Sequence, residues 1–450
     1  MFKKNDEVIV KIDDISVNVQ GIGKIDGAVF FCAGLIPGEK ARVKVIKETK
    51  RYYVAIPIEI LQESKYRIDP PCPVFKRCGG CTLQHTAYEK QLDLKRDRIL
   101  NSFNRIGGFN TKVKECVASP MSYNYRNKAV FPVKRVEGKV VTGFYAPGSH
   151  DIVDTPTCMI HQDKINQVLE ITRNWIDEYN ISTYDEKTTS GLIRHIFARV
   201  SNPDDVMAGL ISNSEHIPNL DKLIENLNNS IDGFKNFSIN VNDKNTNVII
   251  GDKTICLYGS EYITHEIDGL KFDVKLKSFL QVNTPQTEQL YNKALEYADI
   301  KKDDVIIDLY CGIGTITLLA ARRAEKVYGI EFLSESTISA KSNAEKNNID
   351  NVQFICGDCT KEYSSLIKKI ETVNTLILDP PRKGLDSLLI DKIIASKPKK
   401  IVYISCDPGT LSRDLKLFSD AYDIVEATPF DLFPQTTHVE CVVILNKISI

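Results

Sequence analysis

The stretch Val305-Ile-Ile-Asp-Leu-Tyr-Cys-Gly-Ile-Gly-Thr315 decides the fold of the C-terminal part of the chain. It opens with a continuous apolar run suited to a buried parallel strand and closes with a Gly-x-Gly turn, where missing Cβ atoms let backbone approach a ligand. Similar apolar runs begin at residues 326, 352, 375 and 401, and helical stretches separate them. This alternation predicts a doubly wound α/β sheet with a ligand crevice at the carboxyl ends of its strands.

The turn itself favours a nucleoside cofactor without a pyrophosphate. Thr317 stands where a dinucleotide-binding Gly-x-Gly-x-x-Gly motif has its third glycine. Glu331 ends the next strand run, where a carboxylate can accept hydrogen bonds from ribose hydroxyls. S-adenosylmethionine is therefore favoured over a nicotinamide dinucleotide. Asp358, after the third run, is expected either to meet the adenine or to cap a helix.

Three reactive side chains follow later strand runs. Cys406 ends one run just before a helix start at Pro408, where we expect the backbone dipoles to favour its thiolate. Asp379 opens Asp-Pro-Pro-Arg, in which the prolines fix the backbone beside a planar base. Glu440 lies among apolar residues, where desolvation raises the pKa of a carboxyl group and lets it act as a base. Together they indicate covalent chemistry on an electrophilic ring carbon.

Residues 1 to about 60 predict a small β-barrel. Short β-branched or aromatic runs begin at residues 7, 28, 41 and 52, and the Gly21-Ile-Gly23 stretch is interpreted as a turn between them. The segment 40–53 is basic and ends in two aromatic residues, which favours single-stranded RNA binding over a merely solvated edge strand. Its basic residues are Lys40, Arg42, Lys44, Lys47, Lys50 and Arg51, followed by Tyr52 and Tyr53.

Four spaced cysteines mark the central region, residues 61–277, which otherwise predicts a mixed α+β arrangement with a helix over about 88–104. Cys72, Cys78 and Cys81 lie in a loop rich in proline and glycine, and Cys158 follows far along the chain. A Cys-x2-Cys pair with two further cysteines indicates a metal centre. The spacing alone leaves both zinc and an iron–sulfur cluster open, because each uses four cysteines.

Composition limits the class of protein. The 450 residues suggest two to four domains, and a net charge of −1 gives no global nucleic-acid signal. No apolar run has the length of a membrane span, and the start lacks the apolar core of a secretory signal. We therefore expect a cytoplasmic protein without membrane contact. With no sign of an obligate protein partner, we expect a monomer.

In its motifs the chain resembles the RNA uracil-5-methyltransferases. The matching segments are Phe279-Leu-Gln-Val-Asn283, the turn at 308–315, Asp379-Pro-Pro-Arg382, Ser405-Cys-Asp-Pro408 and Phe433-Pro-x-Thr-x-His-Val-Glu440. The four cysteines and an N-terminal barrel similar to a TRAM domain narrow the resemblance to the iron–sulfur-containing branch that acts on 23S ribosomal RNA. The resemblance covers essentially the whole chain.

This resemblance implies a TRAM barrel at 1–60, a central domain at 61–277 and a Rossmann-like class I S-adenosylmethionine methyltransferase domain at 278–450. It implies a [4Fe-4S] cluster on Cys72, Cys78, Cys81 and Cys158, with a structural and RNA-positioning role. The residues that it places around S-adenosylmethionine are Gln281, Tyr310, Gly312, Gly314, Glu331, Asp358 and Asp379.

For the reaction, the resemblance implies that Cys406 adds to C6 of a flipped uridine, that C5 takes the methyl group, and that Glu440 removes the C5 proton. The expected substrate is 23S ribosomal RNA. Transfer RNA is the nearest alternative, and an iron–sulfur RNA-binding protein without catalysis is a more distant one.

Overall fold

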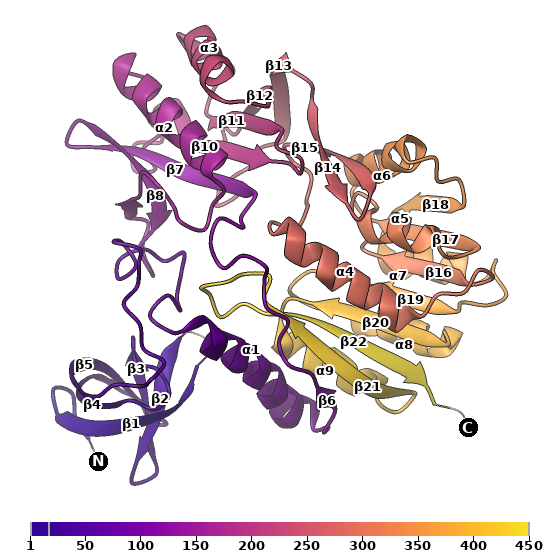
Figure 1. The fold of residues 1–450 in the computed structure, drawn as a ribbon, viewed down its shortest axis with the longest axis horizontal. Helices are drawn as coiled ribbons and strands as arrows, with labels where there is room; N and C mark the ends of the chain where they lie inside the picture. Colours follow the sequence, from indigo (N-terminus) through magenta and orange to yellow (C-terminus); the bar gives the residue numbers. More distant parts are fainter. Residues whose placement is uncertain (1, 17–18, 449–450) are drawn as a thin grey trace.

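The computed structural model describes residues 2–16 and 19–448, and its strands form three main units along the chain (Figure 1). The N-terminal unit is a closed barrel, the central unit is a seven-stranded sheet, and the C-terminal unit is an eight-stranded sheet. None of the helices in these described ranges is long and apolar enough to cross a membrane.

The N-terminal unit confirms the predicted barrel, with strand order β1-β2-β3-β5-β4. Gly21 and Gly23 do not form the predicted turn but lie within a strand. A Cβ on Gly23 would come 2.2 Å from the carbonyl oxygen of Lys11, so glycine is needed here for close packing. The strands are β1 (Glu7–Ile15), β2 (Gln20–Ile25), β3 (Ala28–Ala33), β4 (Lys40–Glu48) and β5 (Tyr53–Gln62).

The two aromatic residues after the basic segment of the barrel have different surroundings. Tyr53 stacks on Phe30 in the barrel core, with 5.0 Å between ring centroids. Tyr52 is exposed and packs edge-on against Phe31. Only Tyr52 is therefore accessible for stacking with a base.

The central unit is one sheet in the order β13-β12-β11-β10-β7-β8-β9, with two helices packed against its apolar side chains. A separate hairpin leads from it toward the C-terminal unit. The elements are β7 (Lys128–Val136), β8 (Lys139–Tyr145), β9 (Ile152–Asp154), α2 (Asp163–Glu178), β10 (Ile193–Val200), β11 (Val206–Ser212), α3 (Leu220–Ser230), β12 (Phe234–Val241), β13 (Lys253–Gly259), β14 (Tyr262–Ile267) and β15 (Leu270–Lys275).

The C-terminal unit confirms the predicted doubly wound sheet, in the order β18-β17-β16-β19-β20-β22-β21-β6. Strands β16 to β20 are parallel, and β22 pairs antiparallel with both β20 and β21. The elements are α4 (Thr284–Ala298), β16 (Val305–Leu309), α5 (Thr315–Ala321), β17 (Lys326–Glu331), α6 (Ser334–Lys346), β18 (Val352–Cys356), α7 (Cys359–Leu366), β19 (Thr375–Leu378), α8 (Ser387–Ser396), β20 (Lys400–Ser405), α9 (Pro408–Phe418), β21 (Tyr422–Phe430) and β22 (Glu440–Lys447).

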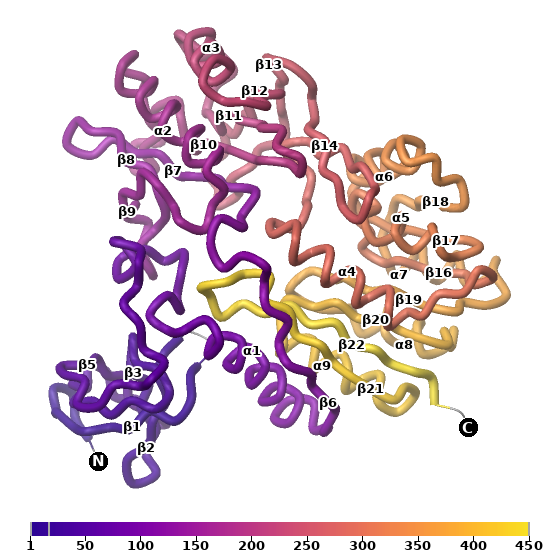
Figure 2. The backbone as a smooth tube through the Cα atoms, in the orientation of Figure 1, coloured from indigo at the N-terminus to yellow at the C-terminus, as the bar shows by residue number. Residues whose placement is uncertain are grey.

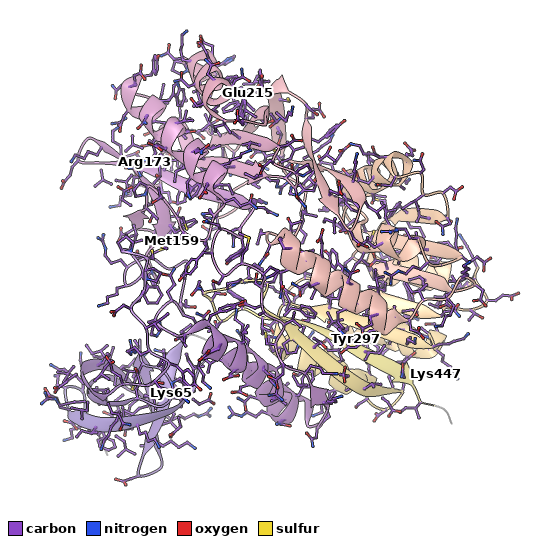
Figure 3. All side chains as sticks on the ribbon, viewed as in Figure 1. Lys65, Met159, Arg173, Glu215, Tyr297 and Lys447 are labelled. Atoms are coloured by element: carbon purple, nitrogen blue, oxygen red, sulfur yellow. The ribbon has the colours of Figure 1, made fainter. Side chains whose placement is uncertain are left out.

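Helices cover both faces of this sheet. Helices α4, α5 and α6 supply apolar side chains to one core, and α7, α8 and α9 supply the other. Helix α4 also contacts β21, because the hydroxyl group of Tyr297 hydrogen-bonds to Glu426 at 2.9 Å and to Thr428 at 2.6 Å (Figure 3). The N-cap of α4 is Asn283, whose side chain accepts a hydrogen bond from the Gln286 N–H group at 3.4 Å. Thr284 is the first residue of the helix.

The C-terminal sheet includes a segment from the central region. Helix α1 (Tyr88–Ser102) continues as a π-helix (Phe103–Gly107), close to the predicted span, and packs against α9. Strand β6 (Lys112–Val113) then pairs in parallel with β21, with Val113 opposite Ala427. Figure 2 shows α1 running from the barrel side of the molecule to β6, which lies beside β21. A division of the chain at residue 277 therefore separates β6 from its own sheet.

A buried ion pair joins the barrel to the segment that leaves it. Glu39 is fully buried, accepts a hydrogen bond from the Ile36 N–H group at 2.9 Å and pairs with Arg67. The guanidinium of Arg67 also donates to the carbonyl of Gly34 at 2.8 Å.

Replacing Arg67 with Met is expected to destabilise the barrel by about 3 kcal/mol, because a buried carboxylate is left without its cation. Hydrogen–deuterium exchange of barrel peptides under increasing urea measures this loss. The matched control is Arg42→Met, whose partner Glu59 is exposed, and there the change should stay within about 1 kcal/mol. Equal effects of the two substitutions would contradict the assignment.

Candidate functional site

The predicted reactive residues come together at the carboxyl edge of the C-terminal sheet. Strand pairing places Leu309, Leu378 and Tyr403 side by side, so the chain leaves β16, β19 and β20 at neighbouring points. Ser405 lies opposite Cys441 in the antiparallel pair of β20 and β22. Cys406 directly follows Ser405 and Glu440 directly precedes Cys441, so the two residues flank this pair at the sheet edge, and the charge of Glu440 acts on the thiol.

Cys406 is half-buried, and its pKa is raised to about 11 by burial and by the charges of Glu440 and Asp379, with Arg382 acting in the opposite direction. The expectation that the helix dipole favours a thiolate is therefore wrong for the free protein. The residue that caps α9 is Asp407, whose carboxylate accepts from the Thr410 N–H group at 2.8 Å. Cys406 lies one residue farther from the helix, where desolvation and the two acids raise its pKa.

Glu440 and Asp379 form an acidic pair behind the thiol. Glu440 is 3% exposed, and burial together with the charge of Asp379 raises its pKa to about 8, against a lowering by Arg382. Burial of its carboxyl group raises the pKa of Asp379 to about 7, although the residue as a whole is only half-buried. The prediction that desolvation raises the pKa of Glu440 is confirmed. Near neutral pH both acids can therefore exchange protons.

Helix α9 holds the loop that follows Asp379. The hydroxyl group of Thr410 donates to the carbonyl of Arg382 at 3.1 Å. Asp414, which is fully buried, accepts from the Leu385 N–H group at 2.8 Å and from the Tyr403 hydroxyl at 2.7 Å. The helix that begins just after Cys406 thus fixes the loop that carries Arg382, the cation acting on the thiol and on Glu440.

The Gly-x-Gly turn has the strand–turn–helix geometry that its sequence predicts. Tyr310, Gly312 and Gly314 all have positive φ, at 67°, 56° and 86°, and Tyr310 is a non-glycine residue in this region of backbone strain. A Cβ on Gly312 would have no atom of the described chain within 4 Å. This open space above the backbone fits a ligand that lies against the turn.

Glu331, predicted to meet ribose hydroxyls, lies at the turn. Its carboxylate accepts hydrogen bonds from the N–H groups of Gly312 at 3.1 Å and Leu333 at 2.8 Å. Each carboxylate oxygen accepts more than one hydrogen bond, so these contacts leave room for a hydroxyl donor.

Thr317 has a role that the sequence reasoning missed. It was interpreted only as a missing glycine, yet its hydroxyl group donates to the buried carboxylate of Asp308 at 2.6 Å. Burial raises the pKa of Asp308 to about 8. The spacing Asp-x8-Thr across the turn is the signal in the sequence that points to this pair.

The other two predicted cofactor residues lie on either side of this edge. Gln281 is 7% exposed, and its carbonyl accepts from the Asn127 side chain at 3.2 Å, which ties it to the central region. Asp358 is exposed and caps α7 by accepting from the Lys361 N–H group at 3.1 Å. Of the two expectations for Asp358, the helix cap is the one observed.

The four predicted metal ligands line one cavity of about 180 Å³, although Cys158 is distant from the others in sequence. Burial and the charges of the neighbouring cysteines raise the pKa of Cys81, and burial raises that of Cys158. His161 also lines the cavity, and in the described chain its two buried ring nitrogens have no hydrogen-bond partner. Yet no group of three or more His, Cys, Asp or Glu residues within the described ranges is arranged to hold a metal ion.

Comparison with known proteins identifies the family. The family model described as tRNA (Uracil-5-)-methyltransferase matches residues 87–448. An uncharacterized RNA methyltransferase of Clostridium tetani is 40% identical over 446 residues, covering 99% of this chain and 97% of its own length. One of Listeria innocua serovar 6a is 40% identical over 448 residues, covering 99% of each chain.

A solved structure extends this comparison to the fold. It is the crystal structure of the Pyrococcus abyssi tRNA (uracil-54, C5)-methyltransferase in complex with S-adenosyl-L-homocysteine. It matches with a TM-score of 0.78 and 27% identity, covering 97% of this chain and 100% of the Pyrococcus chain. The chain belongs to the tRNA (uracil-5-)-methyltransferase family, and it is an RNA (uracil-C5)-methyltransferase.

Proposed function

We propose that this enzyme methylates C5 of a uridine in 23S ribosomal RNA, with Cys406 as nucleophile and Glu440 as base. The observation that carries the proposal is the register of β20 and β22, which brings the thiol and the buried acid to one point of the sheet edge. A nucleophile beside a base of raised pKa is what addition to a ring carbon followed by proton removal requires.

The proposed steps use these two side chains in turn. The Cys406 sulfur bonds to C6, and the electrons of the C5–C6 double bond move onto the ring as an enolate. The thiol proton passes to the neighbouring Asp379 carboxylate as this bond forms, because a group with a pKa of about 11 enters the reaction neutral. Glu440 stays ionised for the later proton removal. C5 then bonds to the methyl carbon. Glu440 takes the C5 proton, the C5–C6 double bond forms again, and the sulfur leaves C6.

S-adenosylmethionine supplies the methyl group when bound, and it leaves as S-adenosylhomocysteine. The open space above Gly312 and the S-adenosyl-L-homocysteine bound in the related Pyrococcus structure support this cofactor. The residues proposed to hold it are Gln281, Tyr310, Gly312, Gly314, Glu331, Asp358 and Asp379. Asp379 would lie between cofactor and uracil, since it follows β19 beside both the turn and Cys406.

Transfer RNA is the second candidate substrate. The Pyrococcus enzyme, described as acting on tRNA, matches this chain over almost its full length, so the match includes the barrel. A TRAM-like barrel therefore does not distinguish the two substrates. The resemblance of the four-cysteine set favours ribosomal RNA.

Transfer of labelled methyl groups to unmodified 23S ribosomal RNA and, separately, to unmodified transfer RNA distinguishes the two. We expect 5-methyluridine in the ribosomal RNA, identified by nucleoside digestion and mapped by mass spectrometry. Product in transfer RNA alone would retain the chemistry and overturn the substrate. No product in either RNA would contradict the proposed activity.

Glu440→Gln is expected to accumulate a covalent RNA adduct, because addition and methyl transfer proceed while removal of the C5 proton fails. A band of reduced mobility on a denaturing gel, dependent on S-adenosylmethionine, reports the adduct. Cys406→Ala is the matched control and should give neither adduct nor product while still binding the cofactor. An adduct formed by Cys406→Ala would contradict the assignment of the nucleophile.

We further propose that the four cysteines hold a [4Fe-4S] cluster with a structural role. Support comes from the cavity that all four residues line and from the unpartnered His161 on its wall, a potential hydrogen-bond donor to sulfur. A cluster is larger than a single zinc ion, so its ligands surround a space rather than converge on one point. A cavity lined by all four cysteines meets this requirement.

Protein purified without oxygen is expected to absorb broadly near about 400 nm, where iron–sulfur charge transfer falls. It should contain about four irons and four sulfides per chain. Cys78→Ser should lose most of both, whereas Cys256→Ser, outside the set, should retain them. A colourless protein that contains zinc would overturn the cluster.

A further inference from the structure

The loop between β21 and β22, residues 431–439, leads into Glu440 and is held by residues of the central region together with the N-cap of α4. Tyr125 donates from its hydroxyl group to the carbonyl of Pro434 at 3.1 Å. Asn283 donates to the carbonyl of Leu432 at 3.2 Å. The N–H groups of Thr82 and Leu83, directly after Cys81, donate to the carbonyl of Gln435 at 2.8 and 2.9 Å.

One face of α1 makes the most extensive contacts with this loop. Lys95 is 1% exposed and forms an ion pair with Asp431, which is fully buried. The same ammonium group donates to the carbonyl of Phe433 at 3.1 Å. A cation that pairs with a buried carboxylate and also binds a carbonyl two residues later fixes the beginning of the loop.

Gln91 and Arg98, one helical turn before and after Lys95, hold the remainder of the loop. The side chain of Gln91 donates to the Gln435 side-chain oxygen at 3.0 Å and accepts from the Gln435 N–H group at 3.1 Å. Gln435 has a φ of 69°, a conformation that a non-glycine residue adopts only when its surroundings impose it. Arg98 donates to the carbonyl of Thr437 at 2.7 Å.

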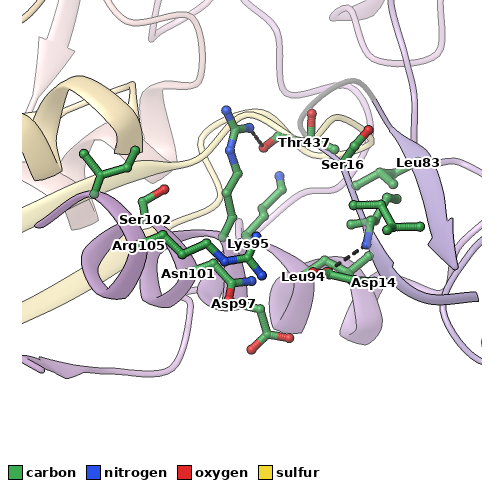
Figure 4. A pocket seen from close by; sticks show the side chains of 14 residues that line it. Asp14, Ser16, Leu83, Leu94, Lys95, Asp97, Asn101, Ser102, Arg105 and Thr437 are labelled. Atoms are coloured by element: carbon green, nitrogen blue, oxygen red, sulfur yellow. Dashed lines mark hydrogen bonds between the residues drawn. The ribbon is translucent and has the colours of Figure 1, made fainter. Parts of the chain in front are cut away.

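The positions 91, 95 and 98 recur at helical spacing, so all three side chains reach the loop from one face of α1. This face also lines a cavity of about 330 Å³, with Asp14 and Ser16 of the barrel on its other side (Figure 4). The hydrogen bond between Arg98 and Thr437 lies at the wall of this cavity. The loop that ends at Glu440 is therefore set against a helix from another part of the chain.

We infer that Lys95 and Arg98 are positioning residues for proton removal: they fix the loop so that the Glu440 carboxylate lies over C5 of the uracil. The inference rests on the proposed role of Glu440 as base. The hydrogen bonds of both side chains go to the loop, although the charge of Asp407, next to Cys406, also acts on Arg98. We therefore expect thiol addition and methyl transfer to be retained without them. A base displaced by about 1 Å loses on the order of a hundredfold in rate.

The test measures the covalent adduct and the product together, in single-turnover reactions of Lys95→Met and Arg98→Met with RNA and labelled S-adenosylmethionine. We expect the adduct to accumulate as it does in Glu440→Gln, with product formation about 10- to 100-fold slower. Lys90→Met is the matched control, because Lys90 lies on the same helix but pairs with the exposed Asp93. It should behave as the wild type.

Each outcome of these reactions either supports or overturns the positioning role. A loss of product without adduct in both variants, or unchanged kinetics, overturns the inference while Glu440→Gln still traps its adduct. If Glu440→Gln traps nothing, the base assignment fails and the positioning role fails with it. Should Lys95→Met not fold, because Asp431 is left buried without its cation, Arg98→Met decides alone, since its half-buried side chain carries no ion pair with the loop.

Discussion

The antiparallel pairing of β20 with β22 is the constraint on which the reactive edge depends. The first five strands of the sheet run parallel and end at one edge, and an antiparallel neighbour begins where they end. Cys406, which directly follows β20, and Glu440, the first residue of β22, therefore lie close together, and their charges interact. A shift of the register by one residue would move Glu440 to the opposite face of the sheet.

Burial at this edge raises the pKa of several ionisable side chains. Asp308, Asp379 and Glu440 all have a raised pKa because apolar strands surround them, and the same desolvation raises the pKa of Cys406. Arg382 is the cation that opposes the shifts of Glu440 and Cys406. Burial at the sheet edge therefore favours the protonated form of each of these groups, and Arg382 acts against this for Glu440 and Cys406.

The sequence alone predicted those features that depend on interactions between residues close together in the chain. Apolar runs and glycine turns predicted the barrel and the doubly wound sheet, and an acid among valines predicted the raised pKa of Glu440. The errors have non-local causes. Gly23 is glycine because another strand passes 2.2 Å from where its Cβ would be, and the pKa of Cys406 depends on acids from two other strands. The pairing of β6 with β21 joins residues that no local pattern connects.

The pairing of β6 also determines where the chain can be divided. A fragment that began at residue 278 would expose the edge of β21 along with the apolar face on which α1 packs, and an uncovered strand edge promotes aggregation. The family model begins at residue 87, which is the N-cap of α1. The family match therefore includes the helix and the short strand together with the methyltransferase sheet.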